Sequence, residues 1–368
     1  MSNQINYIPW AKPDFGGNEQ KYLADALTST WISDGYYIRK FEEDFTRYFG
    51  SKFGITTSNG TAALQLAILA CDIGPGDEVV VPGFTFVAPA NMVIAAGAIP
   101  VYADVDPRTW LIDPTSIEKC ITKKTKAVIV VHIYGNICDM DSINNIALKH
   151  DLWVIEDTAE AAFSKYKGKL AGAFGDIGCF SFQATKTITM GEGGCVLTDN
   201  SHLHEKMRLI RDHGMRKEKR YWHDVVGFNF RLTNMQAAVG CGQLDNINNI
   251  IFNRKRVYEL YRDELDNEYG INMQYFPAYV EPVVWAIAVK IDPNAFRGDR
   301  DFLIEKMLEM GIETRPGFYS FGVMPLYNTT ILPVSGDVGA NVLSFPSYPS
   351  LTSDEIRFIC NEFKKFRK

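Results

Sequence analysis

The sequence predicts an α/β fold, with a mostly parallel central sheet covered by helices and a smaller α+β C-terminal domain. Short runs rich in Val and Ile alternate with helical patterns between residues 52 and 200. These runs are almost continuously apolar, which is typical of strands buried on both faces of a sheet. Beyond residue 233 the texture changes to long helices with few strands. We therefore predict a large domain at 1–245 and a small domain at 246–368.

The elements of the large domain follow from this alternation. Strands are expected at 53–57, 78–81, 101–104, 126–132, 152–156, 178–182 and 195–198. Helices are expected between them at 61–70, 89–96 and 143–150. The first helix, TAALQLAILA, is rich in Ala and Leu, which favour helices.

The C-terminal third predicts fewer strands. One helical pattern covers 233–267, and Gly240 and Gly242 predict a kink in it. A strand is expected within 282–291, a helix at 299–310 and a terminal helix at 353–366. This mixture is typical of a small α+β unit.

Composition excludes several classes of protein. The chain has 368 residues, of which 46% are hydrophobic and 22% charged, so it is neither disordered, collagen-like nor a coiled coil. A formal net charge of -6 argues against a general binder of nucleic acid or anionic membranes. The sequence lacks a signal peptide at its opening MSNQ and any apolar run of ~18 residues, which predicts a cytoplasmic protein without a membrane span.

Cysteine and histidine spacing does not favour a metal. The seven Cys residues form no C-x-x-C pair. His202 and His204 would not share a helix face, because residues two apart point in different directions. We therefore predict no metal site.

Two candidate catalytic residues follow predicted strands. Asp157 comes at the end of one strand, where open α/β sheets bind ligands, and Lys186 follows another. Pyridoxal phosphate (PLP) needs an amine for a Schiff base and a carboxylate beside its ring nitrogen. The pair is therefore a candidate PLP site, whereas either residue alone is more often a helix or turn cap or a surface charge.

Two strand-to-helix junctions add candidate cofactor contacts. In the segment TSNGTAAL, Gly60 permits close backbone approach and Thr61 offers an N–H and a hydroxyl, as a phosphate site requires. An ordinary helix cap is the alternative. In the segment GFTF, Phe84 could stack on a flat ring or belong to the core.

The usual nucleotide-binding signatures are missing. The G-x-G occurrences that begin at Gly74, Gly191 and Gly240 each lack the third glycine of the dinucleotide fingerprint. The sequence also contains no G-x-x-x-x-G-K-[ST] motif. A P-loop is thereby excluded.

The sequence resembles the DegT/DnrJ/EryC1/StrS family of PLP-dependent sugar aminotransferases almost from end to end. The matching segments are WIS at 31–33, FE at 41–42, SNGTAAL at 58–64, PGFTF at 82–86, ED at 156–157, GDIG at 175–178, SF at 181–182, GEGG at 191–194 and GFNFRLTN at 227–234, with the lysine at 186. The resemblance implies the PLP-dependent transferase fold type I, like that of aspartate aminotransferase. It also implies that PLP cycles with pyridoxamine 5'-phosphate.

The resemblance implies roles around the cofactor ring. Lys186 would form the covalent link to PLP and later move a proton between the substrate carbon and the cofactor. Asp157 would pair with the ring nitrogen. Glu160 would lie near the phenolic oxygen, and Phe84 against the ring.

Other matching residues would hold the cofactor phosphate. The resemblance assigns this role to Gly60, Thr61 and Ser181. Asn229 would reach the phosphate of the neighbouring subunit's cofactor. The expected assembly is therefore a homodimer with shared active sites.

Three segments resemble the branch of the family that aminates C4 of GDP-4-keto-6-deoxymannose. They are YWH at 221–223, ETRP at 313–316 and the stretch 346–351. By the same resemblance the amino donor is L-glutamate, and Arg315 and Tyr319 are candidate contacts to the substrate. The segments QAT at 183–185, YSFG at 319–322 and WAIA at 285–288 depart from that branch. A ketosugar linked to dTDP or UDP therefore remains an alternative.

Three other activities are alternatives to an aminotransferase. A sugar dehydratase of the same fold uses His where this chain has Lys186. A regulatory relative without turnover is disfavoured by the intact Lys186, Asp157 and Asn229. A nicotinamide-dependent sugar dehydrogenase would lack the yellow colour of bound PLP.

Overall fold

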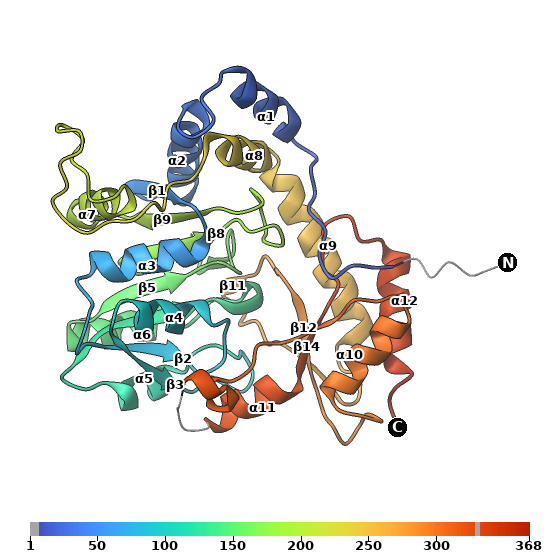
Figure 1. Cartoon of the computed structure of the whole chain (residues 1–368). Coiled ribbons are helices and arrows are strands. Elements are labelled where there is room, and N and C mark those ends of the chain that lie inside the picture. The colour runs from blue at the N-terminus through green and yellow to red at the C-terminus, as the bar shows by residue number, and fades with distance from the viewer. Residues whose placement is uncertain (1–6, 328–331) are drawn as a thin grey trace.

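A seven-stranded sheet forms the centre of the computed structural model, which describes residues 7–327 and 332–368 (Figure 1). The opening MSNQ, where the sequence predicts no signal peptide, lies outside these residues. The strands run in the order β1-β9-β8-β5-β4-β2-β3. Strand β9 pairs antiparallel with β1 and β8, whereas neighbours from β8 to β3 pair in parallel. The predicted mostly parallel sheet is confirmed.

The strands lie within two residues of their expected bounds. They are β1 (Phe53–Thr57), β2 (Glu78–Pro82), β3 (Ile99–Ala103), β4 (Thr125–Val131), β5 (Trp153–Asp157), β8 (Ile177–Ser181) and β9 (Gly194–Thr198). Burial on both faces explains their apolar sequences. Val79 and Val81 pack into the core on one side, and Val80 into a second core on the other.

Helices cover both faces of this sheet. One face packs against α3 (Gly60–Ala70), α4 (Ala88–Ala95) and α7 (Ser201–Arg211). The other packs against α5 (Pro114–Cys120), α6 (Met140–His150) and α2 (Tyr36–Phe49). The predicted helices are confirmed as α3, α4 and α6. Helices α2, α5 and α7 were not predicted from the sequence.

Two N-terminal helices lie beside the sheet, next to α8 (Asn234–Asp245) (Figure 1). They are α1 (Glu19–Thr28) and α2. The predicted kink at Gly240 and Gly242 is wrong: the helix breaks at Asn246, and α9 (Ile247–Leu265) continues the chain. Gly242 serves a different purpose, because a Cβ there would lie 2.5 Å from the backbone nitrogen of Glu19. It lets α1 approach α8 closely.

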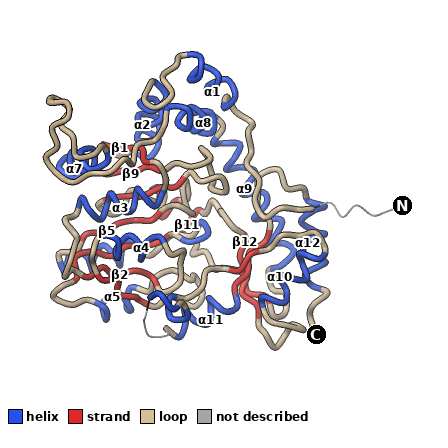
Figure 2. Tube along the Cα trace, viewed as in Figure 1, coloured by secondary structure: helices blue, strands red, loops and turns tan. Residues whose placement is uncertain are grey.

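The C-terminal part contains a four-stranded antiparallel sheet within the described residues (Figure 2). Its order is β10-β12-β14-β13, with bounds β10 (Ile271–Met273), β12 (Ile287–Ile291), β13 (Arg315–Pro316) and β14 (Val342–Phe345). The helices around it are α9, α10 (Arg300–Glu309), α11 (Pro333–Asn341) and α12 (Ser353–Lys364). The predicted helices α10 and α12 are confirmed, and the expected strand is shortened to β12. A domain boundary at residue 246 stays a prediction.

The chain start packs on this C-terminal part. Ile8 forms a parallel bridge with Ile312 and is buried in the C-terminal core. A third sheet, β11-β6-β7, links the two parts through β6 (Lys165–Tyr166), β7 (Lys169–Leu170) and β11 (Val280–Glu281). Residues far apart in the sequence therefore meet beside the central sheet.

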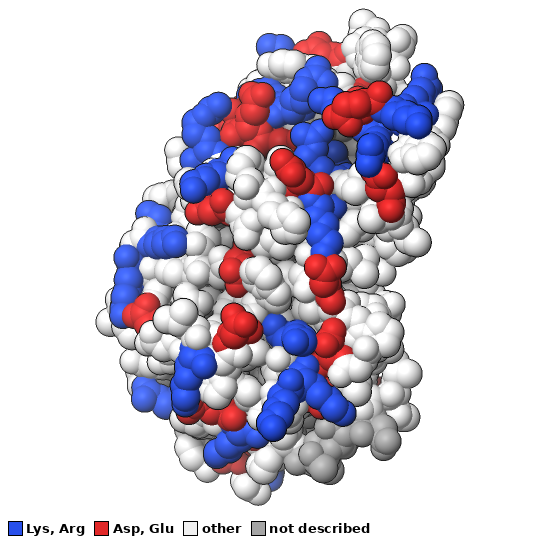
Figure 3. Space-filling view, turned by 90° about the vertical axis from the view of Figure 1, so that its left-hand side faces the viewer, with Lys and Arg blue, Asp and Glu red and all other residues white. Residues whose placement is uncertain are grey.

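No helix in 7–327 or 332–368 is both long and apolar enough to cross a membrane. On the face shown in Figure 3, Lys and Arg side chains lie among Asp and Glu side chains. The described part of the chain holds no cluster of three or more His, Cys, Asp or Glu side chains suited to a metal.

Candidate active site

A cavity of about 940 Å³ opens at the carboxyl ends of the central strands. Asp157 at the end of β5 and Ser181 at the end of β8 lie in its wall. The N-terminus of α3 and strand β13 from the C-terminal part complete it. The sequence-predicted residues that the structure brings together here are Gly60, Thr61, Asp157, Glu160, Ser181, Lys186, Asn229 and Arg315.

Lys186 is positioned by an acid and an aromatic ring. Its side chain is only 14% exposed, and its Nζ lies 3.6 Å from Glu160 Oε1. The same nitrogen lies 3.8 Å from the ring centre of Trp285, a favourable cation–π contact. Trp285 Nε1 also donates a hydrogen bond of 2.8 Å to the carbonyl of Thr185. The amine is thus held inside the cavity.

Asp157 provides a buried carboxylate at the base of the cavity. The residue is 7% exposed, and its Oδ1 accepts a hydrogen bond from the Ala159 N–H at 3.1 Å. Burial raises the pKa of Asp157, and the Ala159 hydrogen bond and the charge of Lys186 only partly oppose this. A cation placed against this carboxylate would stabilise its ionised form.

Glu160 is the acid that lies beside the lysine amine. It is 4% exposed and accepts a hydrogen bond of 3.0 Å from the Tyr134 N–H. Burial raises the pKa of Glu160 to about 7, although the charge of Lys186 lowers it. The carboxyl group can therefore gain or lose a proton near neutral pH.

The start of α3 forms an anion-binding cradle. Asn59 caps the helix through the Ala62 N–H, and its carbonyl accepts from Ala63. Within the described residues the first-turn N–H groups of Gly60 and Thr61 have no acceptor. A Cβ on Gly60 would lie 2.6 Å from Ser181 Cβ, so only glycine leaves this space open.

Asn229 lines the cavity of its own chain. Its side-chain oxygen accepts a hydrogen bond of 3.2 Å from Arg231 Nε, and Arg231 also pairs with Asp212. The amide nitrogen of Asn229 is thereby left as a donor. The contact between Asn229 and the cofactor of a neighbouring subunit stays a prediction.

The expected position of Phe84 against the cofactor ring is wrong. Phe84 is fully buried in the core, close to Tyr134 and Phe318. Phe86, two residues later, is 53% exposed and lines the cavity. The motif GFTF was therefore correctly located, but its second aromatic residue faces the site.

Of the two candidate substrate contacts, only Arg315 lines the cavity. Arg315 pairs with Glu313 at 2.8 Å and lies 4.4 Å from the ring centre of Trp10. Tyr319 is outside the cavity wall and lies beneath the guanidinium of Arg300. A contact between Tyr319 and the substrate therefore finds no support in the cavity wall and stays a prediction.

Four aromatic residues that the sequence analysis did not identify form an aromatic wall of the cavity. Trp10, Tyr134, Trp285 and Phe318 all line the cavity. Trp10 packs edge-on against Trp285 with ring centres 5.3 Å apart, and Tyr134 stacks on Phe318 at 5.6 Å. No local motif marks these residues, because they come from distant segments of the chain.

The residues present fit PLP. The under-compensated carboxylate of Asp157 suits a protonated ring nitrogen, and the amine of Lys186 suits an aldehyde. The cradle at Gly60, which a Cβ would fill, suits a phosphate at a helix N-terminus.

Comparison with known proteins agrees with this fit. Residues 13–364 match the DegT/DnrJ/EryC1/StrS aminotransferase family. Two similar proteins are GDP-perosamine synthases, one from Caulobacter vibrioides (42% identical, covering 95% of each chain) and one from Escherichia coli O157:H7 (39% identical, covering 98% of this chain and 99% of that one).

Solved structures of aminotransferases share the fold. Spr1654 from Streptococcus pneumoniae, in its PLP form, superposes with a TM-score of 0.93 at 25% identity and covers 98% of both chains. The expected fold type I and the PLP cofactor are confirmed. The chain belongs to the DegT/DnrJ/EryC1/StrS family of PLP-dependent sugar aminotransferases.

Proposed function

We propose that this enzyme transfers the amino group of L-glutamate to C4 of GDP-4-keto-6-deoxymannose and forms GDP-perosamine. The observation that carries the proposal is the similarity to GDP-perosamine synthases, at 39–42% identity over 95–98% of the chain. The cavity of about 940 Å³ falls within the size range of sites for cofactors and small molecules.

The proposed reaction requires an amine carrier and a proton carrier in one site. When bound, the cofactor supplies an aldehyde that takes up the amino group and a ring that accepts electrons from the carbon being deprotonated. L-Glutamate leaves as 2-oxoglutarate, and the ketone carbon of the sugar becomes an amine-bearing carbon. The protein must therefore move protons at both carbons.

Lys186 Nζ is the proposed proton carrier. It lies inside the cavity, beside Glu160 Oε1 at 3.6 Å. Glu160 would act near the phenolic oxygen of the cofactor, where its ability to hold a proton near neutral pH is useful. Asp157 would hold the ring nitrogen in its protonated form.

The remaining side chains would bind and orient. Gly60, Thr61 and Ser181 would hold the phosphate, and Phe86 takes over from Phe84 as the proposed ring contact. Arg315 would contact the substrate with the part of its guanidinium that is not hydrogen-bonded to Glu313.

We also propose a homodimer with shared active sites in the cytoplasm. The amide of Asn229 would then serve the neighbouring subunit's phosphate, as the family resemblance implies. Aromatic and aliphatic side chains outside the core, among them Trp31, Ile32 and Trp222, offer apolar area for the subunit contact. Light scattering and a mixed-variant activity assay would test this assembly.

A substrate screen tests the main proposal. The purified enzyme is incubated with L-glutamate and one of three 4-keto-6-deoxy sugars, linked to GDP, dTDP or UDP, and the product is analysed by mass spectrometry. The expected result is an aminated product with the GDP sugar. Amination of only the dTDP or UDP sugar would contradict the nucleotide assignment and leave the aminotransferase activity intact.

A further inference from the structure

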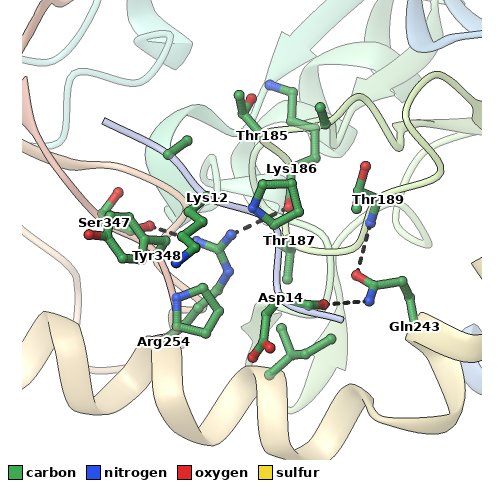
Figure 4. Close-up of a pocket in the computed structure, with 15 residues that line it drawn as sticks. Lys12, Asp14, Thr185, Lys186, Thr187, Thr189, Gln243, Arg254, Ser347 and Tyr348 are labelled. Atoms are coloured by element: carbon green, nitrogen blue, oxygen red, sulfur yellow. Dashed lines mark hydrogen bonds between the residues drawn. The ribbon is translucent and has the colours of Figure 1, made fainter. Parts of the chain in front are cut away.

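The backbone that carries Lys186 is contacted by a buried arginine from the C-terminal part of the chain. Arg254 on α9 is 6% exposed, and its Nη2 donates to the carbonyl of Lys186 at 3.4 Å. Figure 4 shows this guanidinium beneath the Lys186 segment, and Arg254 is not among the residues that line the large cavity. It therefore contacts the main chain of Lys186 rather than its amine.

The same guanidinium contacts two other segments. Its Nη1 donates to the carbonyls of Trp285 at 3.2 Å, Ser347 at 3.4 Å and Val284 at 3.5 Å. Arg254 thus connects the Lys186 segment with the chain before β12 and the chain after β14. The first of these segments carries Trp285, whose ring contacts the lysine amine.

Burying this cation is costly. The structure gives it backbone carbonyls as acceptors and no carboxylate partner, and its Nε has no hydrogen-bond partner within the described residues. Burial lowers the pKa of Arg254 to about 10. An apolar side chain would fill such a space at lower cost, so packing alone does not account for an arginine here.

A second hydrogen bond reaches the neighbouring carbonyl. Trp285 Nε1 donates to the carbonyl of Thr185 at 2.8 Å. Side chains from the C-terminal part therefore hold two consecutive peptide groups, those of Thr185 and Lys186. Rotation of this segment would displace the lysine amine from Glu160 and the cavity.

We propose that Arg254 is a positioning residue that sets the location of the Lys186 amine by holding its backbone against the C-terminal part. The proposal rests on the proposed role of Lys186 as the residue that binds PLP. Arg254 does not touch the substrate space, so its loss affects attachment of the cofactor and the chemical step more than substrate binding.

Arg256 provides a matched control. It lies on the same helix and also donates to two backbone carbonyls, those of Pro349 at 2.9 Å and Leu351 at 2.8 Å. The structure gives it no hydrogen bond to the Lys186 segment. Its replacement removes a comparable structural contact without disturbing the lysine.

The test compares R254M, R254K and R256M with the unchanged holoenzyme. Each protein is reduced with borohydride, and peptide mass spectrometry measures the fraction of Lys186 that carries reduced cofactor. Steady-state kinetics give kcat and KM, and thermal unfolding gives Tm.

For R254M we expect at least a threefold lower attached fraction and a kcat lowered tenfold or more, with KM for the ketosugar changed less than threefold. R254K retains the charge but loses the fork of donors, so it should fall between R254M and the unchanged enzyme. R256M should match the unchanged enzyme in attachment and kcat, whatever its Tm.

Equal attachment and kcat in R254M and R256M would overturn the proposal. If R254M does not fold, R254K decides by the same two measurements, and values equal to those of the unchanged enzyme count against positioning. Failure of the proposed role of Lys186 is distinguishable, because the unchanged enzyme would then carry no reduced cofactor on Lys186. Failure of the proposed substrate is also distinguishable, because the unchanged enzyme would then carry reduced cofactor but would not aminate the GDP ketosugar.

Discussion

The amine of Lys186 and the carboxylate of Glu160 lie 3.6 Å apart in a cavity whose wall also includes the buried Asp157. Two buried acids thus share the surroundings of one amine, and burial raises the pKa of both. The lysine alone therefore does not fully stabilise their charged forms against burial. A cationic ring bound against Asp157 would stabilise that carboxylate.

Glu160 predicts a pH-dependent stability of the cofactor-free enzyme. Its folded-state pKa of about 7 exceeds the ordinary value of 4.5, so the folded state retains the proton more strongly. Its contribution favours folding below pH 4.5 and is lost as the pH rises from 4.5 to 7, by roughly 3 kcal/mol at most. Urea unfolding of wild type and Glu160→Gln across this range should show a smaller fall for the variant. Parallel curves would contradict the shifted pKa.

Removing the amine should stop turnover. Lys186→Ala deletes the proposed covalent attachment and the proposed proton carrier, and loss of proton transfer alone costs about 10²–10⁴-fold in rate. The measurement is amination of the GDP ketosugar, followed by mass spectrometry over hours. Lys165→Ala, on strand β6 and outside the cavity wall, serves as the control and should keep its activity. Substantial turnover by the Lys186 variant would disprove the assignment.

The charge of Asp157 should matter more than its shape. Asp157→Asn keeps the size of the side chain and can keep the hydrogen bond from Ala159, but it loses the negative charge. We expect cofactor to remain bound and kcat to fall by about two orders of magnitude, a loss of roughly 3 kcal/mol in transition-state stabilisation. Absorbance measures cofactor content, and steady-state assays measure kcat. Unchanged kcat would remove Asp157 from the mechanism.

The phosphate cradle should not tolerate a methyl group. In Gly60→Ala the new Cβ would lie 2.6 Å from Ser181 Cβ, which forces the α3 terminus and β8 apart. We expect the dissociation constant of PLP to rise tenfold or more, as measured by equilibrium dialysis. Gly74→Ala is the matched control, because its nearest neighbour would be an oxygen at 3.8 Å. Equal affinities in the two variants would argue against a cradle at this terminus.

The two aromatic residues of GFTF should respond oppositely to truncation. Phe84→Ala opens a cavity in the core and should lower the free energy of unfolding by about 3–5 kcal/mol. Phe86→Ala alters a half-exposed side chain, so stability should change little while PLP affinity falls. Chemical denaturation and cofactor titration separate the two effects. A loss of affinity confined to the Phe84 variant would reverse the corrected assignment.

Local sequence predicted the strands of the central sheet because those strands are buried on both faces. Val79 to Val81 must be apolar whichever way each side chain points, and this leaves a clear signal. Helix α2 was not identified, although its aromatic residues at 41, 45 and 49 share one face. The break at Asn246 was not predicted either, because glycine has a lower helix propensity than asparagine and drew attention to Gly240 and Gly242. In the structure both glycines lie inside the helix and allow close packing.

The site residues also fall into those that local sequence predicted and those that depend on tertiary packing. Lys186, Asp157 and the cradle at Gly60 follow strand ends, so a rule about sheet topology places them together. Trp10 and Trp285 lie far apart in the sequence and meet only through tertiary packing. Phe84 was misplaced because the orientation of one side chain depends on neighbours that the local sequence does not specify.

The bridge between Ile8 and Ile312 has a consequence for synthesis of the protein. Trp10 Nε1 donates to the hydroxyl of Ser344, a residue 334 positions later. The Trp10 segment therefore waits for synthesis of the Ser344 segment before its wall of the pocket can form. Such long loop closures are slow, so a nascent chain exposes Trp10 until then.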